Sequence, residues 1–132
     1  MLKISEREEK MAHILIIDDE KQIRAMLRQM LEFEGYEVTE ADDGKKGVRS
    51  HSEKPADLII TDIVMPEKEG IETILDIRKI SPAVKIIAMS GGGRIEPETY
   101  LHMARSFGAM RTFAKPIKME ELLKAVRELL SV

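Results

Sequence analysis

Three acidic side chains follow two strongly apolar runs in this sequence. Asp18 and Asp19 come directly after the run ILII (14–17), and Asp62 ends the run LIIT (58–61). Continuous apolar runs of this length are typical of strands buried on both faces. Parallel neighbouring strands end at the same edge of a sheet, so the three carboxylates are expected to meet there. They would form an oxygen-rich site for a hard divalent cation such as Mg²⁺.

Length and composition describe one globular domain. The chain has 132 residues, of which 43% are hydrophobic and 34% charged, and this suits a single core. A net charge of −3 without a dense basic patch argues against nucleic-acid binding by this chain alone. The sequence has no cysteine and no apolar stretch of the roughly 20 residues that span a bilayer. Its charged start, MLKISEREEK, lacks a signal-peptide core, so we expect a cytoplasmic protein.

Apolar runs alternate with amphipathic stretches, five of each, and this indicates an α/β fold with a mainly parallel sheet. The predicted strands are residues 13–17, 36–41, 58–63, 85–89 and 110–114, and the predicted helices are 20–34, 45–52, 70–80, 97–107 and 119–130. The second strand is more polar and is expected at an edge. The Met and Leu stripes of the helices, Met26 and Leu27 among them, are expected to face the core. Three consecutive glycines, 91–93, predict a mobile loop.

Four motifs on this pattern carry a family resemblance. They are HILIIDDE (13–20), LIITDIVMPEKEG (58–70), IIAMSGGG (86–93) and FAKPI (113–117). Together they resemble the receiver domains of two-component response regulators, from about His13 to the end of the chain. The resemblance implies a flavodoxin-like, doubly wound (βα)5 fold whose five-stranded parallel sheet has the order 2-1-3-4-5. We expect a receiver domain over residues 12–132 and an N-terminal extension over residues 1–11. The first ten residues would be either an addition from a start upstream of Met11 or a short helix that packs on the domain.

The resemblance assigns a role to each acid. Asp62 is the expected phosphoacceptor, a carboxylate that forms an acyl phosphate. Asp19, and Asp18 directly or through water, would hold Mg²⁺ together with Asp62 and the backbone carbonyl of Val64. The loose transition state of phosphoryl transfer needs charge neutralisation and in-line positioning, and the metal would supply both.

Two further residues at the ends of predicted strands match the family's switch. Lys115 would place its ammonium on the Asp62 carboxylate and then on the phosphate. Ser90 would donate its hydroxyl to a phosphate oxygen once phosphate is present. Pro116 would fix the turn that aims Lys115, and in the family this bond is commonly cis.

Each of these residues also has a simpler interpretation when taken alone. An Asp pair after a strand is often a solvated loop or a helix N-cap. Asp62 and Lys115 could form a surface ion pair of little energetic value, and Ser90 before three glycines could serve only as a turn residue. The four motifs in family order favour the functional interpretation.

Two departures from the family affect the expected mechanism. Many receivers carry an aromatic residue three positions before the lysine, and Thr112 occupies that place here. Phe113 should face the opposite side of the strand, so we expect the glycine-rich loop and the following helix to carry the signal. Val64 and Gly92 stand where family members often place polar side chains that orient an attacking water. This predicts slow self-hydrolysis of the phosphorylated form.

The expected function is that of a single-domain response regulator, with no enzymatic activity beyond its own phosphorylation and dephosphorylation. Its partners would be a sensor histidine kinase or a histidine phosphotransfer protein, docking near the first helix, and a downstream protein target. The output surface is expected over the helix 97–107, the last strand and the last helix. The protein could also pass the phosphate onward in a relay.

Three alternatives remain open from the sequence. The first is a phosphorylation-independent interaction module on the same fold. The second is an Mg²⁺-dependent phosphohydrolase resembling the haloacid dehalogenase group, but Val64 stands where such enzymes carry a second Asp. The third is a receiver cut from a longer regulator.

Overall fold

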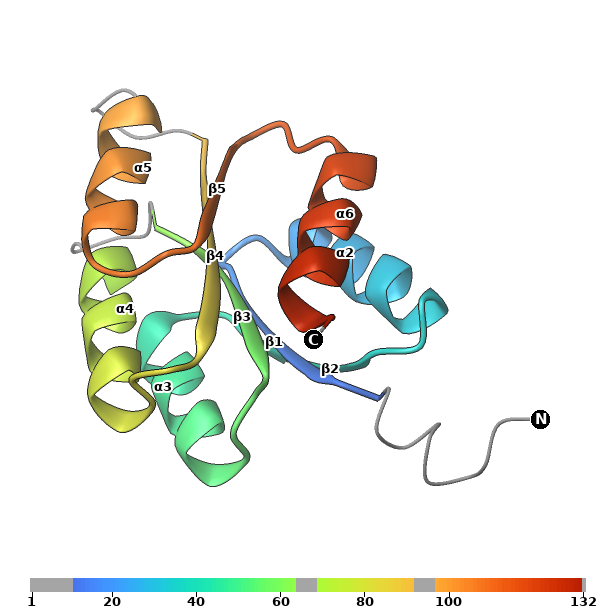
Figure 1. The fold of residues 1–132 in the computed structure, drawn as a ribbon, viewed down its shortest axis with the longest axis horizontal. Helices are drawn as coiled ribbons and strands as arrows, with labels where there is room; N and C mark the ends of the chain where they lie inside the picture. Colours follow the sequence, from blue (N-terminus) through green and yellow to red (C-terminus); the bar gives the residue numbers. More distant parts are fainter. Residues whose placement is uncertain (1–10, 64–68, 92–96, 132) are drawn as a thin grey trace.

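The structure, a computed structural model, describes residues 11–63, 69–91 and 97–131 (Figure 1). Strands and helices alternate throughout these residues. In chain order they are β1 (His13–Ile17), α2 (Lys21–Phe33), β2 (Glu37–Ala41), α3 (Gly44–Glu53), β3 (Leu58–Asp62), α4 (Glu69–Ile80), β4 (Lys85–Ser90), α5 (Pro97–Ser106), β5 (Arg111–Ala114) and α6 (Met119–Leu130). The predicted elements are all present, with ends that differ by at most one residue. The N-terminal extension lies almost wholly outside the described residues and stays a prediction.

All five strands are parallel and form one sheet in the order β2-β1-β3-β4-β5. The predicted flavodoxin-like order 2-1-3-4-5 is therefore confirmed, as is the edge position of the more polar second strand. Strand order changes direction at β1, which lies between β2 and β3. In open α/β sheets the carboxyl ends of the strands beside such a switch point are the usual place for a site.

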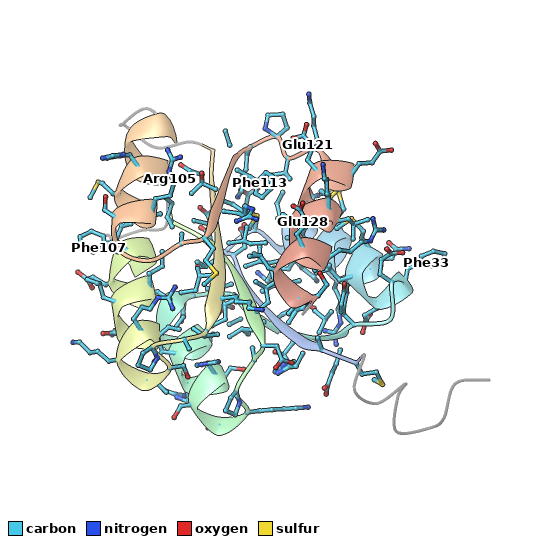
Figure 2. All side chains as sticks on the ribbon, in the orientation of Figure 1. Phe33, Arg105, Phe107, Phe113, Glu121 and Glu128 are labelled. Atoms are coloured by element: carbon cyan, nitrogen blue, oxygen red, sulfur yellow. The ribbon has the colours of Figure 1, made fainter. Side chains whose placement is uncertain are left out.

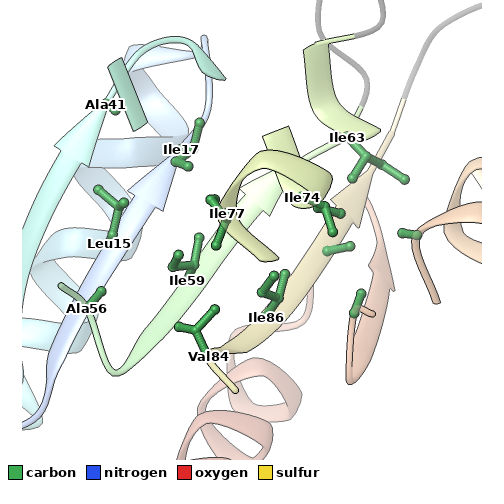
Figure 3. Packing of buried hydrophobic residues seen from close by; sticks show 13 residues of the cluster. Leu15, Ile17, Ala41, Ala56, Ile59, Ile63, Ile74, Ile77, Val84 and Ile86 are labelled. Atoms are coloured by element: carbon green, nitrogen blue, oxygen red, sulfur yellow. The ribbon is translucent and has the colours of Figure 1, made fainter. Parts of the chain in front are cut away.

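Helices cover both faces of the sheet. Helices α3, α4 and α5 lie on one face and α2 and α6 on the other (Figure 1). The first core, between the sheet and α3–α5, is shown in Figure 3. It consists of Leu15, Ile17, Ala41, Ala56, Ile59, Ile63, Ile74, Ile77, Val84, Ile86, Ala88, Ala104 and Ala109.

The second core lies between the sheet and α2 with α6. It consists of Ile14, Ile16, Leu27, Leu31, Val38, Leu58, Ile60, Ile87, Met89, Leu122, Ala125, Val126 and Leu129. Successive residues of one strand thus enter opposite cores, as strand geometry requires. This is why β1 and β3 have continuous rather than alternating apolar sequences.

One of the apolar helix residues was placed wrongly by helical periodicity. Met26 keeps 44% of its surface exposed, so it is not a core residue, whereas its neighbour Leu27 is fully buried as predicted. The apolar pattern on α2 is therefore one residue wider than the face that this helix buries against the sheet.

No helix among the described residues is both long enough and apolar enough to cross a membrane.

The buried imidazole of His51 joins three segments at the amino-terminal end of the sheet. Its Nδ1 accepts the backbone N–H of Ala56 at 3.0 Å, and its Nε2 lies 2.8 Å from the Ser81 hydroxyl. With Nδ1 as the acceptor, Nε2 carries the proton and donates to Ser81. The neutral ring therefore ties α3 to the segment before β3 and to the end of α4.

Acid should weaken this tie. Burial lowers the pKa of His51 below its ordinary value of 6.5, and the charge of nearby His13 lowers it further. The unfolded chain then binds the proton first, so the stability that neutral His51 contributes is present above about pH 6.5 and is lost as the pH falls. We expect the melting temperature to fall less between pH 7.5 and 5.5 in His51→Gln than in the wild type. His102→Gln, at an exposed position, should keep the wild-type slope. Parallel curves for all three proteins would contradict the prediction.

Candidate functional site

The acids meet at the carboxyl ends of β1 and β3. The register pairs Ile17 with Thr61, so the next residues, Asp18 and Asp62, lie side by side. Asp18 is fully buried and Asp62 is 3% exposed, while Asp19 points into solvent. Carboxylate oxygens of these three residues and of Glu20 lie within 4.8 Å of one another. Glu20 is an addition to the set that the sequence predicted.

Lys115 reaches this group from the end of β5, which lies beyond β4 in the sheet. Its Nζ lies 3.0 Å from Asp18 Oδ2, 3.1 Å from Asp62 Oδ2 and 3.2 Å from Glu20 Oε1. Its side chain is 11% exposed, so the pair with Asp62 is a buried contact rather than the surface ion pair of the simpler interpretation. The peptide bond between Lys115 and Pro116 is cis, as the resemblance implied.

Gly91 makes room for the stem of this lysine. A Cβ atom at position 91 would lie 2.2 Å from Lys115 Cβ and 2.8 Å from its Cγ, closer than atoms can approach. From the sequence, this glycine was expected only as part of a mobile loop, and the close approach adds a steric reason for it. The other two glycines of that run, 92 and 93, lie outside the described residues.

Ser90 ends β4 beside the lysine. Its backbone carbonyl accepts the N–H of Lys115 at 2.7 Å, which fixes the start of the last connection to the end of β4. The hydroxyl is fully buried and has no hydrogen-bond partner within the described part of the chain. A buried hydroxyl without a partner is costly, so it calls for an explanation beyond turn formation.

The family model described as the response regulator receiver domain matches residues 14–127. This chain belongs to the response regulator receiver family. Chemotaxis protein CheY of Bacillus subtilis (strain 168) is 34% identical over 123 residues, covering 92% of this chain and all of that protein.

Other relatives are longer than this chain. Transcriptional regulatory protein GlrR of Escherichia coli (strain K12) is 31% identical over 121 residues, and the aligned part is 92% of this chain but 27% of GlrR. Among solved structures, the response regulator receiver domain protein from Clostridium thermocellum has a TM-score of 0.82 at 31% identity, covering 90% of this chain and 94% of that one. Receivers thus occur both alone and as part of larger regulators among the relatives.

Residues that follow β1 hold Asp18 of this receiver in place. Asp18 Oδ1 accepts the backbone N–H of Glu20 at 2.8 Å, and the Asp18 carbonyl accepts from Arg24 Nη1 at 2.8 Å. Arg24 also donates through Nε to Glu40 on β2 at 3.1 Å. The start of α2 is therefore tied to the ends of β1 and β2. Arg24 was not predicted. The amphipathic pattern of a helix shows which residues are apolar, but it does not show which polar side chain contacts the end of a neighbouring strand.

A close backbone approach positions the segment after Asp62. A Cβ atom at Gly70 would lie 2.3 Å from the Ile63 backbone, so only glycine allows the first turn of α4 to pack there. The backbone carbonyl of Val64, expected as a metal ligand, lies outside the described residues and stays a prediction.

Thr112 and Phe113 face opposite sides of β5, as expected. Phe113 packs against the core between the sheet and α6 (Figure 2), where Met89 is its partner in the register. Thr112 pairs with Ala88, whose side chain enters the opposite core. This receiver therefore has no aromatic ring at the position three residues before Lys115.

Burial and charge oppose each other at the site. Burial raises the pKa of Asp18, and the Glu20 N–H and the Lys115 ammonium only partly compensate. Burial alone would lower the pKa of Lys115, but Asp18 and Asp62 outweigh it and hold the ammonium charged. The negative charge of the buried acids is thus only partly compensated, and a further cation at the site would stabilise it.

The donor set fits Mg²⁺ on this basis. Carboxylate oxygens from Asp18, Asp19 and Asp62 are the hard ligands that Mg²⁺ accepts. Lys115 already lies against two of these acids as a positive charge, which shows that their carboxylates converge on a cation.

Asp18→Asn should separate stability from metal binding. The raised pKa means that ionised Asp18 costs folding free energy, increasingly as the pH rises above 3.8. Without Mg²⁺ we expect the variant to melt a few degrees above the wild type at pH 7.5, although its neutral amide cannot form an ion pair with Lys115. With millimolar Mg²⁺ the wild type should gain stability and the variant should not, as thermal unfolding by circular dichroism would report. A variant that melts below the wild type without Mg²⁺ would refute the inference that ionised Asp18 costs folding free energy.

Proposed function

We propose that this receiver accepts a phosphoryl group on Asp62 in the presence of Mg²⁺, from a histidine kinase or a histidine phosphotransfer protein in the cytoplasm. Phosphorylation would change its affinity for a downstream protein. The observation that carries the proposal is the contact of the Lys115 ammonium with both Asp18 and Asp62, next to the buried Ser90 hydroxyl that has no partner in the described part of the chain.

The transfer step needs a carboxylate and charge neutralisation. A carboxylate oxygen of Asp62 forms a bond to phosphorus while the bond from phosphorus to the donor's imidazole nitrogen breaks, and the ring leaves with the electron pair of that bond. Lys115 stabilises the negative charge on the transferred group as a point charge. The chemistry that Mg²⁺ supplies when bound is neutralisation of the phosphoryl and carboxylate charges. No group here needs to act as a base, and we expect no turnover of other substrates.

The switch would follow from new partners for Ser90 and Lys115. A phosphoryl oxygen gives the buried hydroxyl an acceptor, and this interaction exists only in the phosphorylated state. Phosphorylation can therefore shift a two-state equilibrium by the free energy of this contact. Exposed apolar side chains occur on α5, at Met103, and on the connection from α5 to β5, at Phe107 and Met110 (Figure 2 labels Phe107). They support the proposal that this side is the output surface.

Direct phosphorylation tests the proposal. The purified wild type is incubated with acetyl phosphate and Mg²⁺, and the intact mass is measured. We expect a gain of one phosphoryl group that disappears when the metal is chelated. Borohydride reduces an aspartyl phosphate to homoserine, so peptide mapping after reduction should place the change at Asp62. An unmodified wild type would favour the phosphorylation-independent module on the same fold.

The phosphorylated form should be long-lived. Val64 and Gly92 offer no polar side chain to orient an attacking water, an argument from residue type because both lie outside the described residues. In purified protein with Mg²⁺ we expect loss of phosphate over many minutes or longer, followed by intact mass after removal of the donor. Val64→Asn should shorten the lifetime. A wild-type lifetime of seconds would contradict the prediction.

A further inference from the structure

Glu20 stands at the N-cap position of α2, but its side chain does not cap the helix. No hydrogen bond joins that side chain to the first turn of the helix. The N–H of Glu20 itself is satisfied by Asp18 Oδ1 at 2.8 Å. The Glu20 carboxylate lies instead 3.2 Å from Lys115 Nζ, a residue 95 positions away in the chain. Its contact is therefore with the site rather than with its own helix.

Each N–H donor of the Lys115 ammonium has a carboxylate acceptor. The ammonium carries three N–H donors, and three carboxylates lie within hydrogen-bond distance: Asp18 at 3.0 Å, Asp62 at 3.1 Å and Glu20 at 3.2 Å. While Asp62 is still a free carboxylate, an incoming phosphoryl group can pair with Lys115 only if one of these three contacts is released. The arrangement thus contains a competition for one side chain.

Burial decides which carboxylate is released. The side chains of Asp18 and Asp62 are 0% and 4% exposed, while that of Glu20 is 57% exposed. A released Asp18 would lose a charge partner in a buried place, which is costly. A released Glu20 turns to water and is hydrated there at little cost.

We propose that Glu20 is a positioning residue that holds the third proton of the Lys115 ammonium until a phosphoryl group replaces it. This inference rests on the proposed function and assigns to it a built-in competitor. Two consequences follow from removing the Glu20 charge. Lys115 becomes available and the donor meets less repulsion, so phosphorylation at saturating Mg²⁺ is faster, by about threefold. The site also loses one negative charge near the metal ligands, so Mg²⁺ binds more weakly, by about threefold for an exposed and screened charge.

The opposite signs of the two effects make the test specific. Glu20→Gln, Glu128→Gln and the wild type are compared, since Glu128 is an exposed carboxylate on α6 outside the site (Figure 2). Mg²⁺ affinity is measured by calorimetry without a phosphodonor, and initial phosphorylation rates by intact mass with acetyl phosphate at saturating Mg²⁺. We expect weaker Mg²⁺ binding and faster phosphorylation in Glu20→Gln alone. An unchanged affinity or an unchanged or slower rate would overturn the inference.

A conservative variant separates contact from charge. Glu20→Asp keeps the charge but is one methylene too short to reach Lys115 in the same way. It should bind Mg²⁺ as the wild type does and still be phosphorylated faster, and a wild-type rate would count against the contact. Failure of the proposed function is distinguishable, because then the wild type itself takes up no phosphate and the inference falls with it.

Discussion

Asp62→Asn should reduce phosphoryl uptake from acetyl phosphate by more than a hundredfold. The amide has nearly the same shape as the carboxylate, but it lacks the charge and the nucleophilic oxygen that form an acyl phosphate. Asp62 is also one of two nearly buried acids in contact with Lys115, so no neighbour can substitute for it at the same place. Intact mass with acetyl phosphate and Mg²⁺ would measure the loss.

The variant should remain folded, which keeps the result interpretable. Lys115 retains Asp18 and Glu20 as partners, and one of several crowded carboxylates is removed. Asp76→Asn is a matched control, because Asp76 is exposed on α4 and its Oδ1 lies 4.0 Å from the Nζ of the exposed Lys79. It should be phosphorylated like the wild type. Uptake by Asp62→Asn at the wild-type rate would show that the acceptor lies elsewhere.

The fold could be predicted because the strands differ in burial in a way that the sequence records. Residues 14–17 and 58–60 enter two cores in alternation, so every one of these positions is apolar. Strand β2 lies at an edge, and its sequence EVTEA is correspondingly mixed. Helical periodicity was less exact, since Met26 carries the right residue type but faces outward. It lines a groove of about 530 Å³ between α2 and α6, together with Met30, Phe33 and Leu123. The side chain of Phe33 points away from the protein next to this groove (Figure 2).

The site residues that lie at the ends of strands could be predicted from the sequence. The residues that join the site through a side-chain contact with another element could not. Asp18, Asp62, Ser90 and Lys115 all follow from the position of a strand end and the rule that parallel strands end together. Glu20 and Arg24 lie on the connection to α2 and in its first turn, where polar residues are ordinary. Their partners, Lys115 and the Asp18 carbonyl, depend on side-chain direction, which no periodic pattern encodes.

Lys115→Met should destabilise the protein more than other lysine substitutions, by about 2–3 kcal/mol at neutral pH without Mg²⁺. The ammonium is the cation shared by Asp18 and Asp62, and removing one partner of a buried pair leaves an uncompensated buried charge. Lys46→Met removes an ion pair with Asp42 in which the lysine side chain is 60% exposed and the aspartate side chain 49%. This substitution should lower the free energy of unfolding by less than about 0.5 kcal/mol. Urea unfolding of both variants gives the two values.

Magnesium should largely reverse the loss in Lys115→Met. A cation that binds the folded state alone stabilises it by mass action, and it binds more strongly where two carboxylates have lost their counter-charge. The stability gap between Lys115→Met and the wild type should therefore shrink in millimolar Mg²⁺, whereas the small gap for Lys46→Met should not change. A gap that persists in Mg²⁺ would mean that the stem of Lys115 against Gly91, rather than its charge, is what the fold requires. If the charge is what the fold requires, bound Mg²⁺ can take the place of the Lys115 ammonium, because both neutralise the carboxylates of Asp18 and Asp62.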